Sequence, residues 1–401
     1  MLFLGDWAPG EFIDSVTCEI YSDLFVVNLE GAILSHPIVD VEEFKTYKSA
    51  KVGPLLWNKI WPNFPAQSIL TLANNHFMDF GVIYAERTMT NALANGSTTI
   101  GFGKSLDLAR KPARLNYKGK QISIFAVCEN QFGEATNDTP GIAFIGPWLY
   151  GAIAAEKNFS DFVIVVFHGG LEDATWSAPW TQDLLRSYVD VGANLVVAHH
   201  PHKPQAAEQY NGALIYYSLG NFCVDPQMWA NYPYALYSLG VNLEVISGSI
   251  EISTRYFINS THGAGNALKI LEIFPEQGDE ILSVLEKSEK ILRNPDLNLA
   301  VWQETCRFHW NLYLRSLIGA YEVKASTFDR IKNSLLFMFD RNRYAQRKKR
   351  IVETKTAHLY HAISNDTHRE LALQYLRTRG NEKASSEVEM IVKRGLSHLL
   401  P

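Results

Sequence analysis

The stretch Leu195-Val196-Val197-Ala198-His199-His200-Pro201-His202 sets a short apolar run directly before three histidines. A short run that is apolar throughout predicts a central strand covered on both faces. Six similar runs occur among the first 260 residues, at 2–4, 24–27, 68–72, 122–127, 162–167 and 214–217. Helical periodicity lies between them, over 82–95 and 181–191. Strands and helices therefore alternate, and we expect an α/β fold.

Polar side chains follow these runs where the strands are expected to end, which is where α/β folds bind ligands. Three of them offer a carboxylate or amide oxygen and four an imidazole; they are Asp6, Glu30, Asn75, His76, His168, His200 and His202. This mixture suits Mn, Fe, Zn or Co better than Ca or Mg. Seven groups are too many for one four-coordinate ion. The sequence therefore predicts one or two divalent ions, with a bridging carboxylate if there are two.

Each of these residues also has an ordinary structural explanation. Asp6 or Glu30 alone could cap a helix. A single histidine after a strand, such as His168, is more often a hydrogen-bonded core residue than a ligand. The histidines within 199–202 are harder to explain in this way, since twelve histidines in 401 residues rarely place three so close together. The metal hypothesis therefore depends on the joint placement of the groups.

The composition excludes disordered, collagen-like and disulfide-scaffold proteins, since 47% of the 401 residues are apolar and 20% are charged. Residues 1–260 contain 15 Lys and Arg against 25 Asp and Glu, whereas residues 261–401 contain 22 against 17. This change of sign predicts two joined parts, a metal-binding part over 1–262 and an α-helical part over 263–401. Amphipathic helices are expected in the second part, at Asp279–Leu292, 300–321 and 328–339.

Six sequence blocks together resemble a known family. They are Gly5-Asp6, Asn28-Leu29-Glu30, Leu72-Ala73-Asn74-Asn75-His76-x-x-Asp79-x-Gly81, His168-Gly169-Gly170-Leu171-Glu172, His199-His200-Pro201-His202 and Tyr216-Tyr217-Ser218-Leu219-Gly220-Asn221-Phe222. Their order and spacing over about residues 1–225 resemble the CapA family of capsule and poly-γ-glutamate synthesis. That family is a branch of the calcineurin-like metallophosphoesterase superfamily.

The resemblance implies a four-layer α/β/β/α sandwich in residues 1–262, followed by a C-terminal helical appendage. It also implies that two ions lie above the strand ends and that Glu30 bridges them. Metal one would be held by Asp6 and His202, and metal two by Asn75, His168 and His200.

The resemblance also implies roles for three further side chains. His76 resembles the histidine that contacts the substrate or protonates the leaving group, and Asp79 could orient its imidazole. Glu172 matches a family glutamate for which a duty at the metal edge or on the substrate is implied.

Two departures from the pattern matter. The superfamily's first motif is Asp-x-His, but Ala8 occupies the histidine position, so metal one has at most Asp6, Glu30 and His202 as protein ligands. CapA proteins of capsule systems are typically membrane-anchored, whereas this sequence shows no leader and no run of about 18 apolar residues. We therefore expect a cytoplasmic protein without a membrane span.

These features favour a metal-dependent hydrolase. A metal-activated water would attack a phosphoester or a γ-glutamyl-type amide of a small-molecule or peptide-like substrate. The alternative is an accessory protein in the synthesis of an amide-linked or poly-γ-glutamate-like product, which binds polymer or acyl phosphate without hydrolysis. Ala8 somewhat favours that alternative. A third hypothesis is an interaction protein with a relic site.

The basic run 341–350 allows three interpretations. A solvated helix face is favoured, and docking onto the acidic first 260 residues comes second. Nucleic acid is not expected as a partner, because the net charge of the chain is −5 and no reader motif accompanies the run. Assembly into a homo-oligomer through the helical part is a further expectation.

Overall fold

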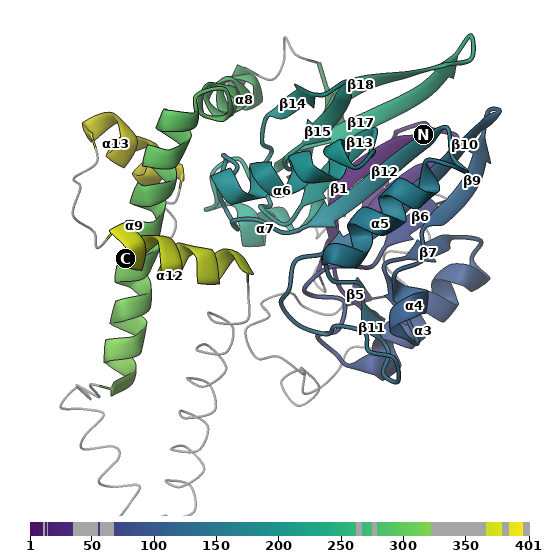
Figure 1. Ribbon diagram of the computed structural model, residues 1–401, viewed down its shortest axis with the longest axis horizontal. Helices are drawn as coiled ribbons and strands as arrows, with labels where there is room; N and C mark the ends of the chain where they lie inside the picture. The colour runs from purple at the N-terminus through teal and green to yellow at the C-terminus, as the bar shows by residue number, and fades with distance from the viewer. Residues whose placement is uncertain are drawn as a thin grey trace, which may run out of the picture.

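The computed structural model describes residues 1–10, 13, 15–34, 55–56, 68–261, 267–274, 279–321, 366–378 and 385–395 (Figure 1). The helix expected at 328–339 and the basic run 341–350 lie outside these residues.

The first sheet has nine strands in the described part of the chain and is mixed in direction. Its central strand β1 (Leu2–Ala8) runs parallel to β3 (Phe25–Leu29), and the order continues through β6 (Ser68–Thr71) to β7 (Thr98–Ile100). On the other side of β1 lie the antiparallel strands β17 (Tyr237–Ile246), β18 (Ser249–Thr261) and β19 (Ala267–Ile273), then β2 (Ser15–Cys18). A short strand, β16 (Asn221–Val224), pairs in parallel with the end of β1.

The second sheet has six strands, four of them parallel. Its order is β14 (Ala207–Tyr210), β15 (Ala213–Tyr216), β13 (Leu195–His199), β12 (Phe162–His168), β10 (Lys120–Cys128) and β9 (Ala113–Tyr117). Two small pairs complete the strands: β8 (Phe102–Gly103) with β11 (Gly141–Ile142), and β4 (Ile33–Leu34) with β5 (Leu55–Leu56). All seven apolar runs form strands of the two large sheets, so the α/β prediction is confirmed.

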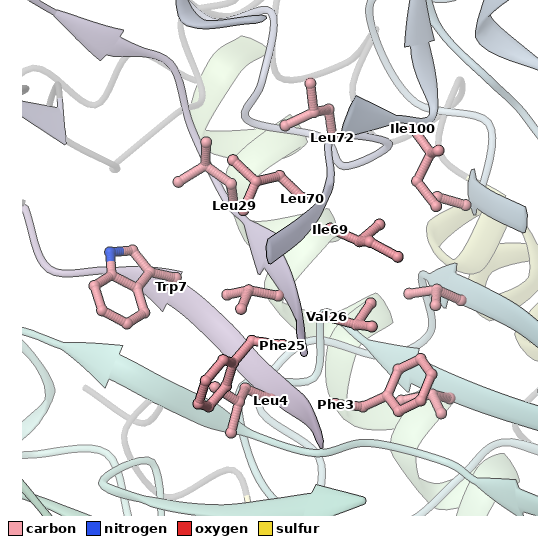
Figure 2. Close-up of a cluster of buried hydrophobic side chains, with 14 of the residues drawn as sticks. Phe3, Leu4, Trp7, Phe25, Val26, Leu29, Ile69, Leu70, Leu72 and Ile100 are labelled. Atoms are coloured by element: carbon pink, nitrogen blue, oxygen red, sulfur yellow. The ribbon is translucent and has the colours of Figure 1, made fainter. Parts of the chain in front are cut away.

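The two sheets pack face to face and share one core. Alternate residues of a strand point to opposite sides of its sheet, so an inner strand can contribute to a core on each side. In β10, Ile122 and Ile124 join the core between the sheets, together with Phe3 and Val26 of the first sheet (Figure 2). Phe125 of the same strand points the other way, into a second core.

That second core is closed by two helices on the outer face of the second sheet, α5 (Pro147–Glu156) and α6 (Pro179–Asp190). Other helices in this part of the chain are α3 (Val82–Ala94), α4 (Leu106–Ala109) and α7 (Pro226–Trp229). Both helices expected from periodicity, at 82–95 and 181–191, are therefore present, as α3 and α6.

The C-terminal helices are α8 (Asp279–Leu292), α9 (Pro295–Tyr321), α12 (Asp366–Thr378) and α13 (Ser386–Gly395). Strand β19 lies beyond residue 262, in the part expected to be helical, yet it pairs with β18 and β2. It joins the sheet because Leu268 and Ile270 bury their side chains in the core between the sheets. Among the described residues, no helix is both long and apolar enough to cross a membrane.

Strand β1 changes partner at Gly5, directly before Asp6. Leu2, Phe3 and Leu4 pair antiparallel with β17, whereas the strand pairs in parallel with β16 from Asp6 onward. The Asp6 N–H donates to the carbonyl of Gly220 at 3.0 Å. A Cβ at Gly5 would lie 2.1 Å from the same carbonyl oxygen, so only glycine allows this close approach.

We therefore predict that Gly5→Ala lowers the free energy of unfolding by about 1–3 kcal/mol, as overpacking against backbone does. Gly151→Ala is the matched control, since Gly151 lies in α5 and a Cβ there meets nothing within 4 Å. That change should be neutral or stabilise by about 0.5–1 kcal/mol. Urea unfolding of both variants measures the difference, and equal stabilities would contradict the prediction.

Candidate metal centre

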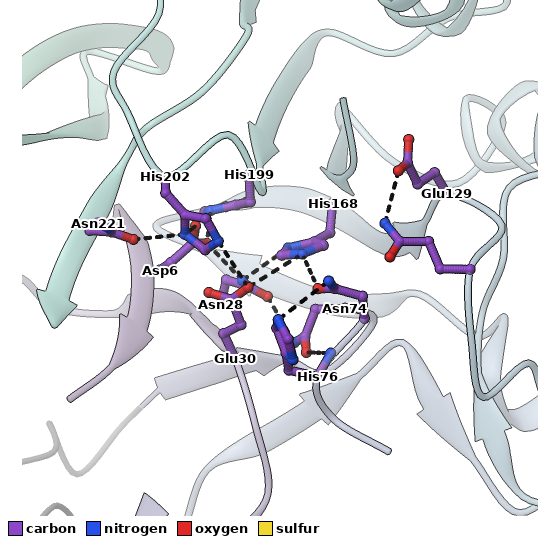
Figure 3. A network of polar contacts seen from close by, with 12 residues as sticks. Asp6, Asn28, Glu30, Asn74, His76, Glu129, His168, His199, His202 and Asn221 are labelled. Atoms are coloured by element: carbon purple, nitrogen blue, oxygen red, sulfur yellow. Dashed lines mark hydrogen bonds and ion pairs between the residues drawn. The ribbon is translucent and has the colours of Figure 1, made fainter. Parts of the chain in front are cut away.

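Polar residues at strand ends of both sheets converge on one buried spot (Figure 3). Asp6 in β1 and Glu30 after β3 come from the first sheet, while His168 ends β12 and His202 follows β13 in the second. All four residues are at most 4% exposed. The packed sheets thus bring together residues that lie almost 200 positions apart in the sequence.

Two groups of three residues can each hold an ion, and they share Glu30. One group is Glu30, His168 and His200, and the other is Asp6, Glu30 and His202. Within each group the ligand atoms lie within 4.8 Å of one another. Both groups contain Glu30, the residue to which the resemblance assigns the bridging role, and two ions at this place stay a prediction.

The carboxylates of Asp6 and Glu30 differ in their hydrogen bonds. Asp6 Oδ1 accepts a hydrogen bond from Asn28 Nδ2 at 2.8 Å and lies 3.0 Å from His199 Nδ1. Asp6 Oδ2 lies 3.4 Å from His202 Nδ1. No described residue hydrogen-bonds to either oxygen of Glu30, although its side chain is fully buried. A buried carboxylate without donors is costly unless it is protonated or faces a cation. The donor set therefore fits one or two divalent ions.

The pKa shifts within the cluster also indicate that its carboxylates stabilise nearby positive charge. Burial raises the pKa of Glu30 to about 7. The charge of His202 lowers this pKa, but it offsets the effect of burial only in part. Burial opposes the charged form of His202 too, but Glu30 and Asp6 raise the pKa of this imidazole well above its ordinary value. Burial also opposes the charge on Asp6, yet its hydrogen bonds with His199 and His202 hold the pKa of Asp6 well below the usual range. The carboxylates of Asp6 and Glu30 thus stabilise positive charge on His202, as they would stabilise a bound divalent ion.

His168 and Asn75 form one edge of the cluster. His168 Nε2 lies 2.9 Å from Asn75 Oδ1 and 3.6 Å from Glu30 Oε1. Burial, aided by the charge of His200, lowers the pKa of His168 well below its ordinary value. A neutral imidazole with its lone pair available is the form that binds metals.

The turn after β13 directs two imidazoles into the site. His200 and His202 have φ angles of 95° and 59°, in the left-handed region that residues other than glycine seldom adopt. Their ring centroids lie 5.9 Å apart, and that of His200 lies 5.0 Å from His168. Strain of this kind persists where the surrounding structure enforces it, as at ligand sites.

The three predicted catalytic residues, His76, Asp79 and Glu172, differ in their surroundings. His76 Nδ1 lies 2.9 Å from Asp79 Oδ2, and Nε2 lies 3.4 Å from Asn75 Nδ2. Burial disfavours the charged form of His76, but the charge of Asp79 and its hydrogen bond outweigh burial and raise the pKa of His76. Glu172 is exposed and belongs to neither three-residue group.

Sequence reasoning assigned no role to several residues that hold the ligands in place. Asn28 contacts both Asp6 and His168, and Asn221 Oδ1 lies 2.9 Å from His202 Nδ1. The alternation of a strand predicts that Asn28 shares a face with Glu30, two residues later. Asn221 is the next-to-last residue of the sixth sequence block, whose residues received no individual role.

Glu129 was also missed, although it follows the apolar run 122–127 and so obeys the strand-end rule. It is fully buried, and burial raises its pKa to about 7 despite hydrogen bonds that favour the charged form. It lies beyond His168, to one side of the cluster (Figure 3).

Aromatic residues near the histidine blocks differ in position. The half-buried ring of Trp229 lies 4.8 Å from the His202 ring and 5.0 Å from that of Tyr232. Phe222 packs edge-on against Phe257 in the core between the sheets, and Trp176 is buried in a third core. Of these rings, that of Trp229 contacts a candidate ligand.

A protein-family model matches the part of the chain that contains most of these site residues. The family model described as "Bacterial capsule synthesis protein PGA_cap" matches residues 21–226, just over half of the chain. The chain belongs to this family. The CapA resemblance is thereby confirmed, and the match contains every candidate ligand except Asp6.

Curated relatives of the PGA_cap chain carry names from polymer synthesis. It is 31% identical over 246 residues to "PGA biosynthesis protein CapA" of Bacillus subtilis, covering 57% of this chain and 63% of that one. It is 29% identical over 169 residues to "Capsule biosynthesis protein CapA" of Bacillus anthracis, covering 40% and 41%. A "Probable polyglutamine synthesis accessory protein" of Mycobacterium tuberculosis is 26% identical over 238 residues, covering 55% and 60%. The chain thus matches less than two thirds of the length of each relative.

The shared position of Glu30 generates a prediction about metal content. Glu30→Gln should reduce bound metal to well under one ion per chain, because both groups lose a ligand. His168→Ala should leave about one ion, since the other group stays intact. Elemental analysis after purification with Mn²⁺ or Zn²⁺ measures this. The control is Glu156→Gln, because the Glu156 carboxylate is also buried but pairs with Arg114 outside the site. Equal losses in the Glu30 and His168 variants would contradict the shared role.

The raised pKa of Glu30 generates a second prediction, for the metal-free protein. The carboxyl releases its proton near its ordinary value of 4.5 when unfolded and at about 7 when folded. The folded state therefore holds the extra proton between these values, and stability should fall as pH rises from about 4.5 to about 7. Glu30→Gln should lose this part of the fall and be the more stable chain above pH 7. Urea unfolding with a chelator measures it, and parallel pH profiles would refute it.

Proposed function

We propose that this PGA_cap protein is a metal-dependent hydrolase that uses a metal-activated water on a phosphoester or a γ-glutamyl-type amide. The observation that carries this proposal is the pair of ligand groups sharing the fully buried Glu30. We also propose that the two packed sheets belong to a four-layer α/β/β/α sandwich, which the helices α5 and α6 on the second sheet support.

The residues present divide the task of holding the ions. Asp6, Glu30 and His202 would hold the first ion, and Glu30, Asn75, His168 and His200 the second. Mn, Fe, Zn and Co match this set of ligands. When bound, such ions activate a water and stabilise the entering and leaving oxygens.

His76 supplies the proton in this proposal. Asp79 Oδ2 accepts a hydrogen bond from His76 Nδ1 and so fixes the imidazole ring. The other ring nitrogen, Nε2, then lies next to Asn75 at the edge of the site. Because the Asp79 charge raises the pKa of His76, the imidazole keeps a proton that it can donate to a leaving group.

The names of the relatives support a peptide-like substrate. They refer to PGA, capsule and polyglutamine synthesis, and a γ-glutamyl-type amide is the bond that such a polymer would present. A small phosphoester remains the other substrate class that the same pair of ions would serve.

A second candidate function is an accessory role in making an amide-linked polymer, with binding but no hydrolysis. Two observations favour it. Ala8 leaves the first group without a further imidazole ligand, and one relative is named an accessory protein.

One substrate panel separates the two functions. The Mn²⁺-loaded protein is assayed on bis-p-nitrophenyl phosphate and on γ-glutamyl-p-nitroanilide, with Asn75→Ala and His200→Ala as variants. Hydrolysis of either substrate that both variants abolish, while they still unfold cooperatively, supports the enzyme. Turnover retained by both variants refutes it. Bound metal without turnover, together with binding to a glutamyl peptide, supports the accessory role.

For the His76–Asp79 pair we predict separate effects on rate and on pH dependence. His76→Ala should lower kcat by about 10²–10⁴-fold with metal content unchanged. Asp79→Asn should lower the pKa of His76, so the loss of activity at high pH should begin at a lower pH. The pH profile of kcat and NMR titration of the metal-free imidazole measure these effects. A profile that Asp79→Asn leaves unmoved would count against His76 as the acid.

A further inference from the structure

The carboxylate of Glu129 links the end of a ligand-bearing strand to the C-terminal helices. Glu129 follows β10, and its N–H donates to the carbonyl of His168 at 2.9 Å. Its Oε2 accepts hydrogen bonds from the N–H of Gly170 at 3.1 Å and from Thr367 Oγ1 at 2.8 Å. One buried oxygen thus bonds the loop after His168 and the first turn of α12.

The loop that follows His168, residues 169–178, is shaped around this carboxylate. A Cβ on Gly169 would lie 2.9 Å from Glu129 Oε2 and 2.5 Å from the Phe167 ring. Gly170 has a φ of 108°, which favours glycine. The loop also reaches the histidine turn, since the Gly169 N–H donates to the His199 carbonyl at 3.1 Å.

Helix α12 is held to the same place by a second pair of hydrogen bonds. The Asn130 N–H donates to Asp366 Oδ2 at 3.1 Å, and the Asp366 N–H donates to the Asn130 carbonyl at 3.3 Å. Glu129, Asp366 and Thr367 are all buried, with Thr367 only 1% exposed.

An apolar core backs these polar contacts. It combines Leu171, Ala174, Trp176 and Ala178 of the 169–178 loop with residues of the C-terminal helices, namely Ile291, Val301, Trp302, Cys306, Leu371, Val388 and Val392. The loop therefore lies between the candidate metal centre and the helices, and it contacts both.

We propose that the C-terminal helices complete the metal centre: Thr367 and Asp366 of α12 fix Glu129, and Glu129 fixes the loop that carries the backbone on from His168. The family model ends at residue 226, so this gives the helices beyond it a task. Thr367 and Glu129 are positioning residues, since neither belongs to a ligand group. The inference rests on the proposed metal site, but its first measurement needs no metal.

The test compares Thr367→Val, which removes the hydroxyl at nearly constant volume, with Thr367→Ser, which keeps it. Thr305→Val is the matched control, because Thr305 is equally buried and its hydroxyl donates within α9, to the Val301 carbonyl. All variants are made in the full chain. The first readout is hydrogen exchange of the metal-free proteins over residues 169–178, and the second is calorimetric titration with Mn²⁺.

Thr367→Val should speed hydrogen exchange in the 169–178 loop by about tenfold or more, because the buried Oε2 of Glu129 loses a hydrogen-bond donor. It should also weaken Mn²⁺ binding at one of two sites by about 10–100-fold, the usual effect of losing a supporting contact. Thr367→Ser should restore both quantities, and Thr305→Val should leave both at parental values.

Three outcomes overturn the proposal: unchanged loop exchange in Thr367→Val, equal acceleration in Thr305→Val, or faster exchange with parental Mn²⁺ affinity. If the parent chain binds no Mn²⁺, the proposed function fails. The exchange result then still decides whether α12 positions the loop.

Discussion

Glu30 places a carboxylate where the two sheets meet and where no described residue donates a hydrogen bond to it. Burying such a charge in a medium of low polarity is tolerable only if a proton or a cation accompanies it. The raised pKa values of Glu30 and His202 show how the cluster meets this requirement with protons alone. The imidazoles of His168 and His202 lie 3.6 and 3.7 Å from Glu30 Oε1, so the site is arranged around this carboxylate.

The sheets supply the positions and the loops supply the ligands. Parallel strands of two packed sheets bring Asp6, Glu30 and His168 to a common edge. The turn after β13 then adds His200 and His202 at the cost of two left-handed residues. Because the strands are fixed by cores on both faces of the second sheet, the ligands need little further ordering when an ion enters.

The sequence predicted the α/β class and the gathering of strand-end residues, because both follow from local patterns: apolar runs and the polar groups after them. It could not predict the contacts of Asn28, Asn221 or Glu129, since each depends on a partner from a distant segment. Strand β19 was unexpected for a similar reason, because its pairing with β18 and β2 outweighs the change in composition near residue 262.

The double pairing of β1 has a consequence for how the molecule is made. Leu2 pairs antiparallel with Asn242, which follows 240 residues later in the chain. Contacts between such distant segments form slowly, and until they form the apolar strand is exposed on the nascent chain. Asp6 lies on that strand, so an unfinished chain cannot assemble the site. The candidate site therefore forms only after β16 and β17 have been synthesised.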